Sequence, residues 1–143
     1  RVDPSDMNNH AIISASMNGH SEVVKLLLSD SRVEPSDVNN HAIITASHNG
    51  HYEVVKLLLS DFRVEPSYMN NQAIRYASHN GHHEVVELLL SDSRVLNKYL
   101  YTDINGIDQK CYDILIKFHK NFSHKNFEFH QKMNKSNWST SLL

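Results

Sequence analysis

The sequence predicts an all-α fold of the solenoid type, in which pairs of helices joined by short turns stack in a row. Two observations predict it. Residues 1–31, 32–62 and 63–93 are three copies of one segment; the first two copies agree at 25 of 31 positions, and the second and third agree at 23 of 31. Each copy also contains two helical patterns separated by a glycine. A repeat without insertions is typical of stacked helical units.

Each copy begins with a turn. The string "VDPSDMNN" places proline, which fixes φ, before serine and asparagine, which bond to nearby backbone, and asparagine tolerates positive φ. A short helix is expected over about 11–18, ended by Gly19. A second helix is expected over about 21–29. Its apolar residues form one stripe, Val23, Val24, Leu27 and Leu28, which only stacking on a neighbouring copy can bury.

The junction of the two helices carries a resemblance to a known family. It reads A-S-x-N-G-H-x-E-V-V-x-L-L-L three times within residues 1–93, which resembles the ankyrin repeat pattern A-A-x-x-G-H-x-E-V-V-x-L-L-L. The resemblance implies antiparallel helix pairs with fingers projecting to one side, stacked into a curved array with a concave face. It also implies that His20, His51 and His82 bond loop backbone between repeats.

Two departures from the family pattern change the local expectation. Where the family has Thr-Pro-Leu-His, the copies begin the first helix with "HAII", "HAII" and "QAIR", so the Thr and His ties between repeats are missing. Helix capping is therefore expected from Asn9 or His10 and their equivalents. The copies are also shorter than the family's roughly 33 residues, which predicts a short finger. Asn8, Asn39 and Asn70 replace the family's turn glycine.

The pattern decays after residue 93. Residues 94–120 are interpreted as a degenerate repeat that caps the stack, with an apolar helical stripe of Ile107, Cys111, Ile114, Leu115 and Phe118 and an earlier helix lined by Leu100 and Ile104. Residues 121–143 are predicted to be a polar, basic C-terminal tail. Its first half either stays loosely ordered or packs Phe122, Phe127 and Phe129 onto the cap.

Composition excludes several classes of protein. The net charge is −2, divided into an acidic repeat region (six Lys and Arg against twelve Asp and Glu in residues 1–93) and a basic remainder (eight against four). The longest apolar runs are "LLL", so no membrane helix is expected, and no signal peptide pattern occurs. The single cysteine, Cys111, favours a reducing, intracellular setting, cytoplasmic or nuclear. The chain begins with "RVDPS" on a repeat boundary, which suggests a piece of a longer array.

Sites of chemistry are not expected. His-Asn-Gly-His, at 48–51 and 79–82, could be half of a zinc site beside Tyr52 or His83, but the first copy has Met17 in place of the first histidine and no cysteine lies near. We therefore expect no metal and no cofactor. Cys111 is expected to be a buried, inert thiol rather than a nucleophile, so the chain is not predicted to be an enzyme. Lysines among aromatics in the tail could indicate nucleic acid, but the adjacent array is acidic, and no nucleic acid is expected.

With metal, catalytic and nucleic-acid sites not expected, the sequence favours a surface that binds a protein. This surface is predicted at the positions where the three copies differ. The variable positions are taken to avoid the stripe that must pack. The third copy alone combines Tyr68, Arg75 and Tyr76, and Tyr and Arg are enriched in binding hot spots. The predicted partner-binding residues, on finger tips and the concave helix face, are Tyr68, Met69, Arg75, Tyr76, His79, His83, Met17 and His48.

The sequence thus predicts a protein–protein interaction module. The alternatives are a substrate adaptor of a ubiquitin-ligase type of assembly, with the C-terminal segment recruiting the machinery, and a structural spacer within a longer array. Arrays with this "DPS…NN" turn resemble those of large viral and pathogen families, which implies a host protein as the target.

Overall fold

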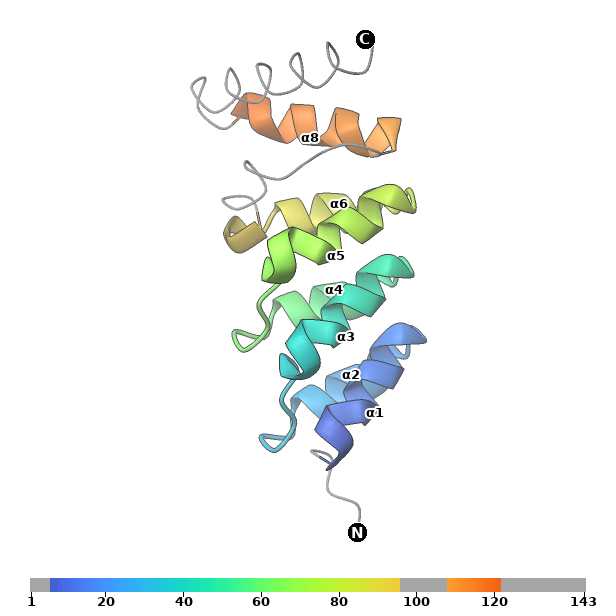
Figure 1. The fold of residues 1–143 in the computed structure, drawn as a ribbon, viewed down its shortest axis with the longest axis vertical. Helices are drawn as coiled ribbons and strands as arrows, with labels where there is room; N and C mark the ends of the chain where they lie inside the picture. Colours follow the sequence, from blue (N-terminus) through green and yellow to red (C-terminus); the bar gives the residue numbers. More distant parts are fainter. Residues whose placement is uncertain (1–5, 96–107, 122–143) are drawn as a thin grey trace.

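The computed structural model describes residues 6–95 and 108–121, which form helices and no strand. The helices are α1 (Asp6–Met17), α2 (Ser21–Leu28), α3 (Asp37–His48), α4 (Tyr52–Leu59), α5 (Tyr68–His79), α6 (His83–Leu90) and α8 (Gln109–Asn121). The pairs stack in one direction, with α1, α3 and α5 in one layer, α2, α4 and α6 in another, and α8 beyond α6 (Figure 1). The predicted all-α solenoid is confirmed, and each second helix ends within one residue of its expected end.

The first helices of the second and third repeats begin with a left-handed turn. Within α3, the φ angles of Val38, Asn39 and Asn40 are +48°, +61° and +58°, and residues 69–71 of α5 repeat this conformation. The Asn40 N–H donates to the Ser36 carbonyl oxygen at 2.8 Å. The expected positive φ at asparagine is confirmed, and it extends to the residue before the Asn-Asn pair. Right-handed helix follows from His41.

A buried asparagine side chain connects each of the first two repeats to the next one. The Asn9 carbonyl oxygen Oδ1 accepts the Glu34 N–H at 2.8 Å, and Asn40 Oδ1 accepts the Glu65 N–H at 2.7 Å. Asn9 Nδ2 also donates to the Asp37 carboxylate at 2.9 Å. The expectation that Asn9 caps its own helix is therefore wrong. Its amide instead supplies a tie between repeats, in the region where the family's Thr and His are missing.

The Gly-His motif also joins consecutive repeats. His51 Nε2 lies 2.9 Å from the Met17 carbonyl oxygen, and His82 Nε2 lies 3.0 Å from that of His48. A carbonyl only accepts, so Nε2 carries the proton in both rings. Asn49 and Asn80 donate to the same two carbonyls. The structural role expected for these two histidines is confirmed.

A third tie is provided by Arg63, near the start of the third repeat, and by Arg94, directly after that repeat. The Arg63 guanidinium pairs with Asp61 at 2.7 Å and donates to the carbonyl oxygens of Val33 (2.6 Å) and Leu28 (3.3 Å). Leu28 ends α2, so the cation lies at a helix C-terminus, where positive charge is favourable. Arg94 repeats the arrangement with Asp92, Val64 and Leu59. The hydrogen bonds from these arginines hold the pKa of Asp61 and of Asp92 below the ordinary value.

Apolar packing runs continuously through the stack. Ile12, Ile43 and Ile74 of the first helices are at most 1 % exposed, and so are Val24, Val55 and Val86 of the second helices. In α8, Cys111 and Leu115 are buried, with Ile114 and Phe118 packed against the same core. The tail from residue 122 lies outside the described residues. So do six residues that the sequence predicts to pack in the cap or the tail: Leu100, Ile104, Ile107, Phe122, Phe127 and Phe129. No described helix has the length and apolar character that crossing a bilayer requires.

Candidate functional site

The exposed side of α1, α3 and α5, called here the first-helix face, is the candidate binding surface. Along the stack, α3 contacts both α1 and α5, and α4 contacts both α2 and α6. Residues 10–17, 41–48 and 72–79 contain no Asp or Glu, whereas each second helix carries at least one Glu. The exposed members of the face include His10, Met17, His41, His48, Arg75, Tyr76 and His79.

Tyr76 and His48 form the centre of this face. Their rings meet edge to face, with centroids 5.4 Å apart and an interplanar angle of 89°. The Gln72 amide donates to the Tyr76 hydroxyl at 2.8 Å from one helical turn earlier. Tyr76 is nevertheless 38 % exposed. The aromatic side chain is therefore held in one orientation while much of it faces solvent.

Arg75 and His79 flank this pair on α5, and both are exposed. His79 Nδ1 lies 2.8 Å from the Arg75 carbonyl oxygen, which fixes the imidazole along the helix. Arg75 occupies the repeat position of Ile44, which is only 6 % exposed. Position 44 is therefore a variable position that is packed, although it lies outside the apolar stripe of the second helices. In the third repeat the isoleucine that would face a further repeat is replaced by an exposed cation.

Tyr68 and Met69 belong to the finger of the third repeat. The Tyr68 hydroxyl donates to Asn39 Oδ1 at 2.8 Å, which leaves the tyrosine half-buried between two fingers. Met69 is 58 % exposed in the left-handed turn. Both residues lie at the start of α5, and Tyr68 has a structural contact that the sequence did not indicate.

The last two predicted contact residues, Met17 and His83, lie on different helix layers. Met17 is 44 % exposed and occupies the repeat position of His48 and His79, so it extends the first-helix face toward α1. His83 begins α6, on the second layer, and its Nε2 lies 3.2 Å from Asp108 Oδ1. The structure therefore separates His83 from the other predicted contact residues and joins it to the segment before α8.

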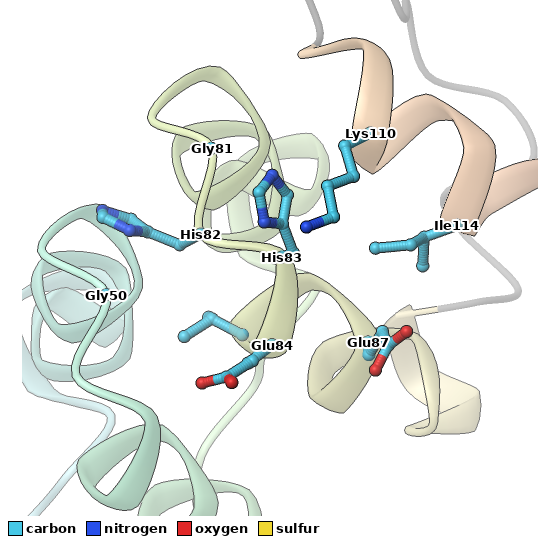
Figure 2. Close-up of a pocket in the computed structure, with 9 residues that line it drawn as sticks. Gly50, Gly81, His82, His83, Glu84, Glu87, Lys110 and Ile114 are labelled. Atoms are coloured by element: carbon cyan, nitrogen blue, oxygen red, sulfur yellow. The ribbon is translucent and has the colours of Figure 1, made fainter.

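A pocket of about 480 Å³ lies beside His83 (Figure 2). Between regular repeats this space is filled, since a Cβ on Gly50 would meet the His82 ring at 2.6 Å. Among the described residues, the nearest atom to a Cβ on Gly81 would be His83 Nε2 at 3.9 Å. Lys110 and Ile114 of α8 line the opposite side, and Figure 2 shows Lys110 extending toward His83.

Cys111 lies at the start of α8, close to this pocket. The side chain is fully buried and is not in a disulfide. Burial, reinforced by the Asp108 carboxylate, raises the pKa of the thiol to about 11. The protonated thiol expected near neutral pH is a poor nucleophile, which agrees with the sequence interpretation. Sequence reasoning did not connect this cysteine with Asp108 and His83, because 25 residues separate the latter two and no known spacing motif links the three.

The comparisons with known proteins agree with this geometry. A family model described as ankyrin repeats (3 copies) matches residues 12–108. No curated protein and no solved structure matches the chain.

Proposed function

Because the chain belongs to the ankyrin-repeat family, whose members are generally protein–protein interaction modules, we propose that it binds a protein partner through the first-helix face and the finger of the third repeat. The proposed contact residues are Tyr68, Met69, Arg75, Tyr76, His79, Met17 and His48. Ankyrin-repeat proteins are typically not enzymes. An intracellular setting fits a chain whose single cysteine allows no internal disulfide.

One observation carries the proposal: the ring of Tyr76 is fixed by His48 and Gln72 and still exposed. A partner that covers a side chain already held in place loses little conformational entropy on binding. Tyr and Arg side chains with packed surroundings are also the commonest binding hot spots. Arg75, beside Tyr76, lies on a surface whose helical segments 10–17, 41–48 and 72–79 contain no carboxylate. The face therefore suits a partner that offers a carboxylate to Arg75 and an apolar group to Tyr76.

The test is affinity capture from cell lysate with three forms of the full chain. The first is the natural sequence, the second carries Tyr68→Ala, Arg75→Ala and Tyr76→Ala, and the third carries Glu53→Ala and Lys56→Ala on the opposite layer as a control. We expect a partner that the natural and control forms retain and the triple variant loses, with circular dichroism showing all three folded. Equal retention by all three forms would refute the binding face.

A second role, as one section of a longer array, is favoured by the first repeat. Val23 is 47 % exposed, whereas its counterparts Val54 and Val85 are each 1 % exposed. Leu26 is 73 % exposed. A further repeat stacked on α1 and α2 would cover both side chains. Fusing a second copy of residues 32–62 before residue 1 should then raise the urea midpoint of unfolding, and an unchanged midpoint would contradict this role.

The ubiquitin-ligase adaptor is the remaining alternative. Its recruiting segment would be the C-terminal tail, which lies outside the described residues. Deleting residues 122–143 distinguishes the two proposals, because an adaptor would lose its machinery and keep its substrate, whereas a simple binding module would keep its single partner.

A further inference from the structure

Three chemically different metal-binding groups converge at the junction of the third repeat and α8. They are the imidazole of His83, the carboxylate of Asp108 and the thiol of Cys111, and one ligand atom from each lies within 4.8 Å of the other two. They come from two elements, since His83 begins α6 and the other two residues are at the start of α8. Packing of α8 on the repeat stack is therefore what brings them together.

The distances are close to those of a tetrahedral zinc site. Zinc bonds of about 2.0–2.3 Å place neighbouring ligand atoms roughly 3.3–3.7 Å apart. His83 Nε2 and Asp108 Oδ1 are already 3.2 Å apart. No ligand-atom spacing in the cluster exceeds 4.8 Å, so the widest would need to shorten by at most about 1 Å to reach tetrahedral geometry.

The carboxylate is held in place by backbone. Asp108 Oδ1 accepts the N–H groups of Lys110 at 3.1 Å and Cys111 at 3.3 Å, at the N-terminus of α8. Hydrogen bonds of this kind orient a metal ligand before the metal binds. The Asp108 backbone N–H in turn donates to the Ser78 carbonyl oxygen at 3.3 Å, which joins the segment to α5.

The cluster is also specific to this junction. The equivalents of His83 in the first two repeats are Ser21 and Tyr52, and Cys111 is the only cysteine of the chain. The adjoining pocket reaches His83, and the Asp108 side chain is 39 % exposed, so solvent can reach two of the three groups, while the Cys111 thiol is buried behind them. A sulfur, a nitrogen and an oxygen together favour Zn²⁺ over Mg²⁺ or Ca²⁺, which prefer oxygen alone.

We propose that His83, Asp108 and Cys111 bind one Zn²⁺ through Nε2, a carboxylate oxygen and Sγ, with water in the fourth position. The bound ion fastens α8 to α6, and the thiol proton leaves to solvent as the Zn–S bond forms. The contact between His83 and Asp108 is thereby replaced by a metal-mediated cross-link between the third repeat and the C-terminal helix.

The test uses the full chain, stripped of metal with a chelator, and Co²⁺ as a spectroscopic substitute for Zn²⁺. We expect one ion per chain and a thiolate-to-cobalt charge-transfer band, which surface histidines cannot produce. Zn²⁺ should displace the Co²⁺ and raise the melting temperature, and Mg²⁺ should do neither. A cobalt complex without the thiolate band would overturn the proposal.

Variants separate this cluster from the other histidines. His83→Tyr introduces the residue that the second repeat carries at this position, so it is compatible with the helix start. It should weaken Zn²⁺ binding by at least about tenfold. Cys111→Ser should abolish the charge-transfer band, and His79→Ala, which alters an exposed histidine of the first-helix face, should leave affinity unchanged. Unchanged affinity in folded His83→Tyr, or equal loss in His79→Ala, would overturn the proposed ligand set. None of these outcomes depends on whether a protein partner binds.

Discussion

Replacing Gly50 by alanine tests the contact between consecutive repeats. Gly50 has a φ of +74°, and a Cβ there would lie 2.6 Å from Nδ1 of His82. To restore an ordinary contact of 3.4 Å the ring must move by about 0.8 Å, which disrupts its bond to the His48 carbonyl. Left-handed backbone costs an alanine about 1–2 kcal/mol. Losing the hydrogen bond adds about 0.5–1.5 kcal/mol.

Gly81 provides the matched control. Its φ of +73° imposes the same backbone strain, but a Cβ there would meet no atom of the described residues closer than 3.9 Å. Gly81→Ala should therefore cost about 1–2 kcal/mol, and Gly50→Ala about 1.5–3.5 kcal/mol. In a His82→Ala background, the additional cost of Gly50→Ala should fall to that of Gly81→Ala. Urea unfolding followed by circular dichroism measures all four variants. Equal costs for the two glycines, or no coupling between Gly50→Ala and His82→Ala, would refute the reasoning.

Three further predictions concern the other ties and the turn. Arg63→Lys keeps the charge but cannot donate to both repeat carbonyls and to Asp61, so it should lower the free energy of unfolding by about 1–3 kcal/mol; an unchanged urea midpoint would contradict this. Val38→Asn should stabilise the chain by about 1 kcal/mol, because asparagine tolerates the left-handed turn better than a β-branched residue, and a lower melting temperature would count against it. The pKa of Asp61 and of Asp92 is depressed below 3.8 in the folded chain, so their stabilisation is present above that pH and is lost as pH falls through the folded-state pKa. Asp61→Asn should therefore reduce stability at about pH 6 and progressively less as the pH falls below 3.8, and a pH-independent effect would be inconsistent with this ion pair.

Much of the fold could be predicted from the sequence because residues that pack between repeats recur at the same position in every copy. The stripe of Val24 and its neighbours, the helix-ending glycine and the Gly-His tie all recur at a fixed period, and each has one physical role. The asparagine tie was assigned to the wrong partner. An asparagine side chain can bond to its own helix or to a neighbouring chain segment, and local sequence does not distinguish these. The role of Arg63 was missed for the same reason, since its acceptors are backbone carbonyls that leave no sequence signal.

The candidate surface was only partly predictable. Internal variation identified Tyr76, His48 and His79, which share one helix layer, but it also included Ile44, a buried position. Variation alone does not separate an exposed contact from a packing position whose neighbour has changed. His83 was selected for its variability, yet its nearest functional groups are Asp108 and Cys111. Their proximity depends on how α8 packs, and the degenerate C-terminal segment carries no repeat pattern from which that packing could be predicted.

The ties between repeats use backbone atoms of the neighbouring unit. His51 binds the carbonyl of Met17 and His82 binds the carbonyl of His48, so the same bond forms whether the neighbour's side chain is methionine or histidine. Arg63 and Arg94 likewise bind carbonyls. Whole repeats can therefore be duplicated, lost or exchanged in a gene while the hydrogen bonds between repeats stay the same. The exposed side chains of each repeat are then free to diverge to suit new partners.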